Sequence, residues 1–124
     1  MKKTIKQTDK KYAFTSSWGK KYTIILVKGQ YSSNSTLAIQ MICVDSKGME
    51  EPFATLTVNL EDSDAYATKK DRAFIDTNNL GSGVTKWLEE NGIAKDTGIL
   101  GFSGYCVYPM YKFTEEALAS MRSM

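Results

Sequence analysis

Apolar and β-branched residues gather in short runs over the first half of the chain, and these runs predict strands. Residues 22–28 (YTIILVK) form one run, and residues 36–44 (TLAIQMICV) have the continuous apolarity of a central strand. Residues 45–48 (DSKG), which follow the second run, predict a hairpin turn whose glycine can take a positive φ. Residues 52–60 predict a third strand with its proline at the entrance, where no ladder donor is lost. The three runs together predict an antiparallel meander.

A helical repeat replaces the strand pattern soon afterwards. Residues 73–76 predict a short strand. The next apolar residues have the spacing of one helical stripe and predict a helix near residues 80–91: Leu80, Val84, Trp87 and Leu88. Asn78 or Asn79 is expected to cap this helix, and Gly92 to end it.

The last part of the chain predicts strand and then helix. Residues 99–113 are rich in aromatic residues and glycine and predict one or two irregular strands. Three glycines at steps of three residues are expected to permit bulges or tight backbone packing: Gly98, Gly101 and Gly104. Thr114 is expected to cap a short helix near residues 115–122, with acidic residues in its first turn.

These elements predict an α+β fold in a single domain of residues 1–124. The expected core element is a mostly antiparallel sheet of about five or six strands, with both helices packed on one face. A short first strand is expected within residues 4–14, and residues 1–11 could instead be a flexible basic arm. With 42% hydrophobic and 24% charged residues, the composition is that of an ordinary globular domain.

The net charge of +2 hides an uneven distribution. The chain up to residue 28 carries eight lysines against Asp9 alone, a net charge of +7, and the remaining residues carry −5. Such a basic segment is typical of contact with a nucleic acid or another polyanion. The alternative is that the lysines only solvate a terminus and protect a sheet edge. The candidate nucleic-acid contacts are Lys2, Lys3, Lys6, Lys10, Lys11, Lys20 and Lys21.

Acidic residues cluster around the middle of the chain, mostly in the polar loop at residues 61–71. An acidic surface of this kind can bind a basic partner, although a solvated loop gives the same pattern. Their order does not match a calcium-binding loop, so no metal site is predicted. The candidate partner-binding residues are Glu50, Glu51, Glu61, Asp62, Asp64 and Asp71.

The absence of histidine argues against most enzyme classes. It removes the Ser-His-Asp and Cys-His nucleophile pairs and the HExxH zinc site. Cys43 and Cys106 stand alone, too few for a structural zinc site and typical of reduced thiols. Residues 81–83 (GSG) lack the Gly-Lys-Ser/Thr of a phosphate-binding loop. We therefore expect neither catalytic residues nor a cofactor. With no apolar run of a secretion signal at the start, we expect a cytoplasmic protein.

Aromatic residues supply the remaining candidates for contact. Trp18 stands between Ser17 and Gly19 in a polar turn and is expected to be exposed. The tyrosines near the C-terminus are expected to pack in the core or on the second face of the sheet, and the alternative is that they anchor an interface or stack on bases. These tyrosines are Tyr105, Tyr108 and Tyr111.

Four segments resemble one bacterial family of domains of unknown function. They are EPFATLTVNL at residues 51–60, FIDTNN at 74–79, LEENGIA at 88–94 and GYCVYP at 104–109. Proteins of this kind resemble cargo of conjugative elements and phages. The resemblance implies no catalytic residues, and the lysine-rich start lies outside it.

Three functions remain open on this basis. The first is a non-enzymatic inhibitor that binds a host defence nuclease, as anti-CRISPR and anti-restriction proteins do, through an acidic face that imitates nucleic acid. The second is a nucleic-acid-binding accessory protein that uses the lysine arm and exposed aromatics. The third, an enzyme that uses only carboxylates and a metal, is the least favoured. The pattern does not predict the oligomeric state.

Overall fold

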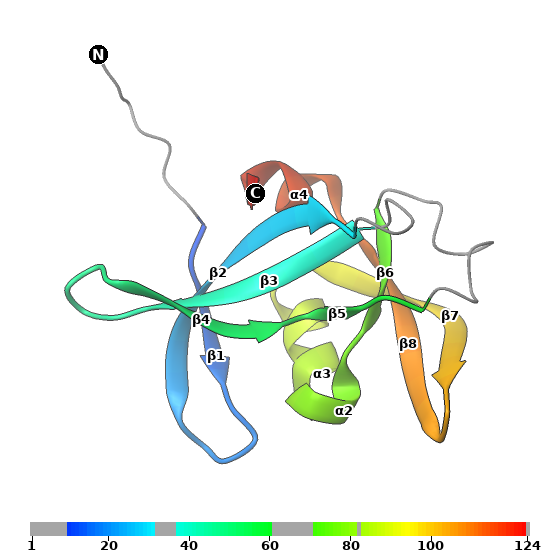
Figure 1. The fold of residues 1–124 in the computed structure, drawn as a ribbon. Coiled ribbons are helices and arrows are strands. Elements are labelled where there is room, and N and C mark those ends of the chain that lie inside the picture. The colour runs from blue at the N-terminus through cyan, green and yellow to red at the C-terminus, as the bar shows by residue number, and fades with distance from the viewer. Residues whose placement is uncertain (1–9, 32–36, 61–70, 82, 124) are drawn as a thin grey trace.

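The described residues fold into two mostly antiparallel sheets that enclose a common core (Figure 1). The predicted α+β class is confirmed, but the strands are divided between two sheets instead of forming one sheet of five or six. The computed structural model describes residues 10–31, 37–60, 71–81 and 83–123.

The first sheet has the order β1-β2-β3-β4 and contains the predicted meander. Its strands are β1 (Tyr12–Thr15), β2 (Lys21–Gln30), β3 (Leu37–Val44) and β4 (Glu50–Thr55). The short strand β9 (Arg122–Ser123) adds to β2 in parallel. The turn between β3 and β4 forms as predicted, because the Asp45 carboxylate accepts hydrogen bonds from two backbone N–H groups and Gly48 has φ +83°.

A bulge in β4 changes the expected position of the proline. Pro52 is the third residue of β4 and not its entrance. Pro52 pairs with Ile42 and Ala54 with Met41, so Phe53 is the extra residue of the longer strand. Because proline has no N–H to donate, it is tolerated beside such an irregularity.

The predicted strand at residues 52–60 is interrupted at Leu56, where the chain passes from the first sheet to the second. The fully buried Leu56 donates its N–H to the Ile39 carbonyl at 2.9 Å and accepts from the Asp76 N–H at 2.9 Å. Strand β5 (Thr57–Val58) then begins the second sheet. One residue therefore connects β3, the second sheet and the start of a helix.

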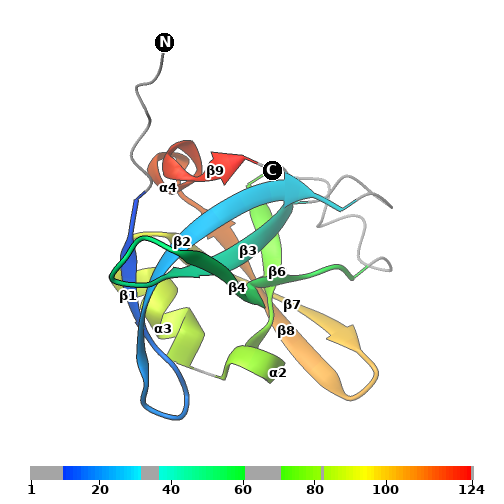
Figure 2. The ribbon, with the colours of Figure 1, turned by 60° about the vertical axis from the view of Figure 1, so that its left-hand side comes forward.

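The second sheet has the order β5-β6-β8-β7 (Figure 1), and Figure 2 shows β6, β8 and β7 from another side. Strand β6 (Arg72–Ile75) matches the predicted short strand to within one residue. The aromatic region forms a hairpin of β7 (Ala94–Ser103) and β8 (Cys106–Phe113), longer at its start than predicted. The register shifts between Asp96 and Leu100, where Gly98 has φ +82°, so the predicted bulge is present.

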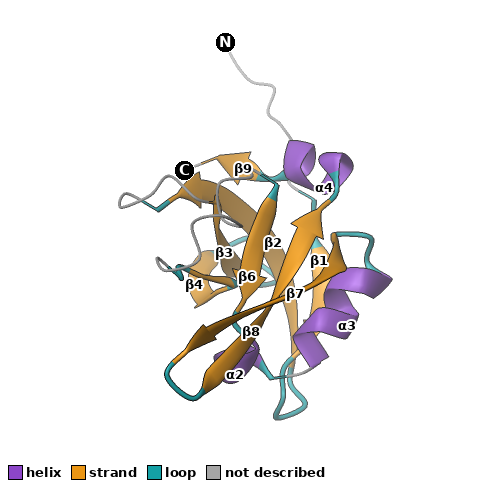
Figure 3. Cartoon of the chain, turned by 90° about the vertical axis from the view of Figure 1, so that its right-hand side faces the viewer, coloured by secondary structure: helices purple, strands orange, loops and turns teal. Residues whose placement is uncertain are grey.

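The described part of the chain also contains three short helices (Figure 3): α2 (Thr77–Leu80), α3 (Gly83–Glu90) and α4 (Glu115–Ser120). Thr114 caps α4 as predicted, accepting from the Ala117 N–H at 3.1 Å. The expected cap at Asn78 or Asn79 is wrong, because the Asp76 carboxylate accepts from the Asn79 N–H and starts α2 earlier. Among the described residues, no helix is long and apolar enough to cross a membrane.

The larger core lies between the two sheets and receives the apolar side of α3 and α4. Trp87 of α3 packs edge-on against Tyr12 and Phe14 and donates its indole N–H to the Ala13 carbonyl at 2.7 Å. Helix α3 therefore fixes β1 by packing and by a hydrogen bond. A smaller core lies on the other face of the second sheet and consists of Leu60, Phe74, Tyr108 and Met110.

Gly101 of β7 is buried against the smaller core, as its spacing suggested. A Cβ atom placed on Gly101 would lie 2.5 Å from Leu60 Cδ1 and 2.6 Å from Phe74 Cε1. Both neighbours are buried and cannot move away freely, so a methyl group has no space.

Gly101→Ala is expected to lower the free energy of unfolding by about 1–3 kcal/mol, because it overpacks this core. Gly83→Ala is the matched control, since a Cβ at Gly83 meets nothing within 4 Å. The control should be neutral or slightly stabilising, because alanine favours helix. Urea unfolding measures both variants, and equal stability of the two would contradict the close approach at Gly101.

Candidate functional site

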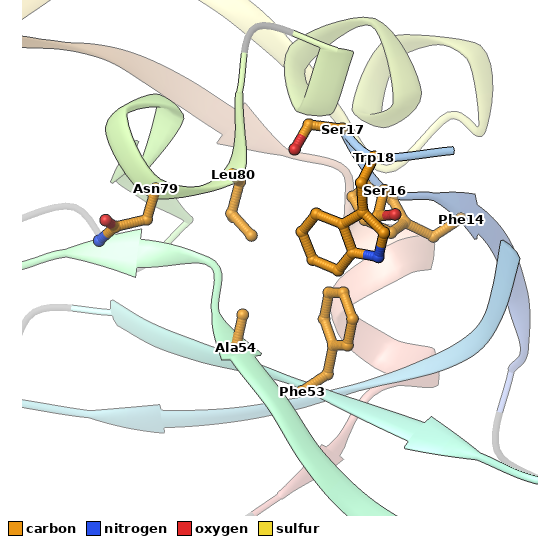
Figure 4. A pocket seen from close by; sticks show the side chains of 8 residues that line it. All are labelled: Phe14, Ser16, Ser17, Trp18, Phe53, Ala54, Asn79 and Leu80. Atoms are coloured by element: carbon orange, nitrogen blue, oxygen red, sulfur yellow. The ribbon is translucent and has the colours of Figure 1, made fainter. Parts of the chain in front are cut away.

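A small apolar pocket opens where the β1–β2 turn, β4 and α2 meet (Figure 4). Its volume is about 180 Å³. The Trp18 pocket, as we call it, is lined by Phe14, Ser16, Ser17, Trp18, Phe53, Ala54, Asn79 and Leu80. These residues come from three distant parts of the sequence.

The β1–β2 turn holds Trp18 at the mouth of the pocket. The Gly19 N–H donates to the Ser16 carbonyl at 2.9 Å, and the Lys20 N–H donates to Ser16 Oγ at 3.1 Å. Gly19 has φ +88°, a conformation that a residue with a side chain rarely adopts. The turn is therefore fixed by its own hydrogen bonds, while Trp18 itself is 68% exposed, as predicted.

The β4 bulge supplies the second wall. In a regular strand, the adjacent residues Phe53 and Ala54 would point to opposite faces of the sheet. Because Phe53 is the extra residue of the bulge, both residues line the pocket. Figure 4 shows Ala54 and Leu80 on one side of the space, with the rings of Trp18 and Phe53 on the other.

Helix α2 supplies the third wall and is held in place by its cap. Asp76 accepts hydrogen bonds from the Asn79 backbone N–H at 3.1 Å and from the Asn79 amide Nδ2 at 2.8 Å. Gly81, with φ +86°, ends the helix against the β1–β2 turn, where a Cβ would lie 3.6 Å from Ser17 Cβ. The end of α2 therefore lies close to the turn that carries Trp18.

A row of aromatic rings supports the pocket from behind. Phe14 meets Phe53 edge-on with the centroids 5.7 Å apart, and Tyr22 lies 4.6 Å from Phe53. Trp18 meets Tyr22 edge-on at 6.5 Å. Edge-to-face pairs of this kind add stability beyond the burial of their area, so the wall is preorganised.

The residues that line the pocket can bind an apolar group, and none of them is an acid or a base. All eight lining side chains are apolar, hydroxyl or amide groups, and none carries a charge. Its volume is below the ~300–1,000 Å³ of pockets that hold drug-sized ligands. Within the described ranges, no group of three or more His, Cys, Asp or Glu residues could hold a metal ion.

The structure places the candidate lysines in separate regions. Lys20 and Lys21 lie beside Trp18 in the β1–β2 region, and Lys20 Nζ lies 5.4 Å from the Tyr22 ring centroid. Lys10 and Lys11 precede β1 and therefore lie at the opposite end of that strand. The other candidates, Lys2, Lys3 and Lys6, lie outside the described residues.

The candidate acidic residues do not form one described cluster. Arg122 donates two hydrogen bonds of 2.8 Å to Glu50, and they hold the pKa of that carboxyl below its ordinary value. Glu51 is exposed in β4, while Asp71 lies beside β6 in the other sheet, 4.0 Å from Lys112 Nζ. Glu61, Asp62 and Asp64 lie outside the described residues.

The three candidate tyrosines differ in exposure. Tyr105 is fully exposed in the β7–β8 turn. Tyr108 and Tyr111 are buried, as core packing predicts, so they are not available as surface contacts. The reason is that the second sheet has a core on each face, with Tyr108 in the smaller cluster and Tyr111 in the larger one.

An exposed apolar surface on the β7–β8 hairpin was not predicted. Leu100, Phe102 and Val107 are 51%, 64% and 44% exposed. Phe102 pairs with Val107, and Leu100 pairs with Pro109, so these side chains lie on one face of the hairpin. The only signal in the sequence is that residues 97–111 contain no charged residue.

The comparison with protein families identifies the chain at the level of a domain. The sequence model of the family described as domain of unknown function (DUF4313) matches residues 25–123, so the chain belongs to that family. No curated protein and no solved structure matches it. The matched span includes β4 and α2 of the Trp18 pocket but not Trp18 itself.

Tyr111 gives the domain an alkaline sensitivity that can be measured. Burial, together with the hydrogen bond that its hydroxyl donates to Glu89 Oε2 at 2.8 Å, raises the pKa of Tyr111 to about 12. The folded state thus favours the neutral phenol, and this stability is complete below the ordinary pKa of 10.0 and is lost as the pH rises towards 12.

As the pH rises from 10 to 12, the free energy of unfolding of Tyr111→Phe should therefore fall less than that of the wild type. At pH 8 we expect a difference of about 1 kcal/mol or less, because one partly buried hydrogen bond is removed. Urea unfolding at each pH measures this, with Tyr105→Phe as the exposed control. An equally steep alkaline loss in Tyr111→Phe would contradict the assignment.

Proposed function

We propose that this protein is a non-enzymatic binding protein whose Trp18 pocket receives an apolar side chain from a partner protein. The observation that carries the proposal is an exposed tryptophan held by a rigid turn over an uncharged pocket. Tryptophan is enriched among the residues that dominate the energy of protein interfaces. When a partner covers an indole that is exposed in the free protein, a large apolar area is removed from water, and this burial stabilises the complex.

The size of the pocket favours a single side chain of a partner protein, and not a free metabolite, as its occupant. A volume of about 180 Å³ suits one large apolar side chain, with the Ser17 hydroxyl and the Asn79 amide at its edge to bond the partner's backbone. The aromatic rings on one side and the aliphatic Leu80 and Ala54 on the other match an aromatic or branched aliphatic group.

For the partner we propose a host defence nuclease, which the protein inhibits in the cytoplasm by occupying its surface. Support comes from the uncharged pocket and from the resemblance to small proteins of phages and conjugative elements. The mechanism differs from the expected mimicry of nucleic acid, because Glu50 is engaged by Arg122 and the pocket is apolar.

A second candidate, nucleic-acid binding, has one observation in its favour. Lys20 and Lys21 adjoin Trp18, so a phosphate and a stacked base could be bound side by side. Binding of this kind weakens steeply with salt because counterions are released. Burial of a side chain in the Trp18 pocket shows little dependence on salt, which separates the two candidates.

Trp18→Ala is expected to abolish inhibition of the target nuclease with only a small loss of stability, because Trp18 is 68% exposed. The measurement is DNA cleavage by a panel of purified CRISPR and restriction nucleases, each with an excess of wild type or variant. Met49→Ala is the matched control, because Met49 is 63% exposed in another turn and does not line the pocket. Urea unfolding verifies that both variants remain folded.

A displayed peptide library tests the pocket independently of the nuclease. Peptides selected on the wild type should share one large apolar residue and lose binding to Trp18→Ala but not to Met49→Ala. If no nuclease is inhibited while such peptides are selected, the inhibitor role fails and the binding role stands. Selection that does not depend on Trp18 would overturn the binding role. Salt-sensitive capture of single-stranded DNA that requires Lys20 and Lys21 would favour the second candidate.

A further inference from the structure

The last part of strand β7, after the bulge, is a sheet edge that carries no lysine, proline or inward charge. It pairs with β8 on one side, and no described strand pairs with its other side. Natural edge strands are commonly protected by lysine, proline or inward charges, because their free backbone groups can pair with another chain. Residues 99–103 (ILGFS), which follow the bulge, carry none of these devices.

The outward side chains of this edge are large and apolar. Leu100 and Phe102 lie on the exposed face of β7, and Val107 continues the face on β8. Scattered apolar residues are normal on a surface, but a contiguous group of them marks an interaction site. A partner that pairs with the β7 backbone would also cover these side chains.

The charge pattern indicates which partner fits. Residues 97–111 carry no charge in a protein with 24% charged residues. An uncharged run is expected in a central strand such as β3, yet here it lies in an edge hairpin. A two-fold interface places a surface against the same surface of the second copy, so a net charge on that surface would face a like charge. The uncharged edge of β7 avoids this repulsion, and it has no charge to attract a charged partner.

We infer that the free edge of β7 pairs antiparallel with β7 of a second copy of this chain. A two-fold axis at Gly101 would place Leu100 of each copy opposite Phe102 of the other, on the same face of the sheet. The two four-stranded sheets then join into one continuous sheet. This dimer is independent of the proposed function, because the Trp18 pocket uses none of these residues.

The test is the molar mass of the full chain in solution over a concentration series, measured by light scattering and sedimentation. We expect a mass that rises from 13.9 kDa towards twice that value with concentration. Phe102→Lys should raise the dimer dissociation constant by about tenfold or more, because it removes a buried ring and places two ammonium groups at the seam. Leu100→Lys should act in the same direction.

Two controls make the result specific. Trp18→Ala replaces an exposed aromatic elsewhere and should leave the mass unchanged. Hydrogen exchange should show that those amides of residues 99–103 that point away from β8 become protected as the dimer forms. A wild type that is monomeric at every concentration overturns the inference and leaves the edge for another occupant. A dimer that forms equally well in Phe102→Lys and Leu100→Lys also overturns it.

Discussion

The passage of the chain through Leu56 is the constraint on which the two sheets depend. Its N–H bonds to β3 and its carbonyl bonds to Asp76, so one peptide segment connects the first sheet to the start of α2. Thr57 strengthens the junction, because its Oγ1 accepts from the Ile39 N–H and also hydrogen-bonds the Tyr31 hydroxyl. Buried polar groups that all have hydrogen-bond partners favour one arrangement of the sheets, because another arrangement would leave some of them unpaired. The walls of the Trp18 pocket from β4 and α2 extend from this junction.

Features that depend on near neighbours could be predicted from the sequence. The Asp45–Gly48 turn and the Thr114 cap each follow from residues two or three positions apart. The break at Leu56 could not be predicted, because the alternation of apolar residues continues unbroken from Ala54 to Leu60. An alternating pattern says that a residue faces a core, and it does not say which sheet the residue joins.

The candidate site was predictable only in part, for a related reason. Trp18 could be singled out because a tryptophan in a polar turn has no local reason to be buried. Phe53 and Leu80 read as ordinary core residues, and only the β4 bulge and the early cap at Asp76 bring them beside Trp18. The exposure of Leu100 and Phe102 has no comparable local signal, because it depends on their position in an edge strand of the second sheet.

The Trp18 pocket is built from two parts of the chain with different relations to the family. Phe53, Ala54, Asn79 and Leu80 lie inside the matched span 25–123, whereas Phe14 to Trp18 precede it. The matched domain therefore provides one half of the pocket lining, and the preceding N-terminal residues provide the other half. Of these N-terminal residues, only the turn residues Ser16 to Trp18 can therefore change the shape of the pocket without changing strands of the first sheet, because β1 and β2 supply core residues.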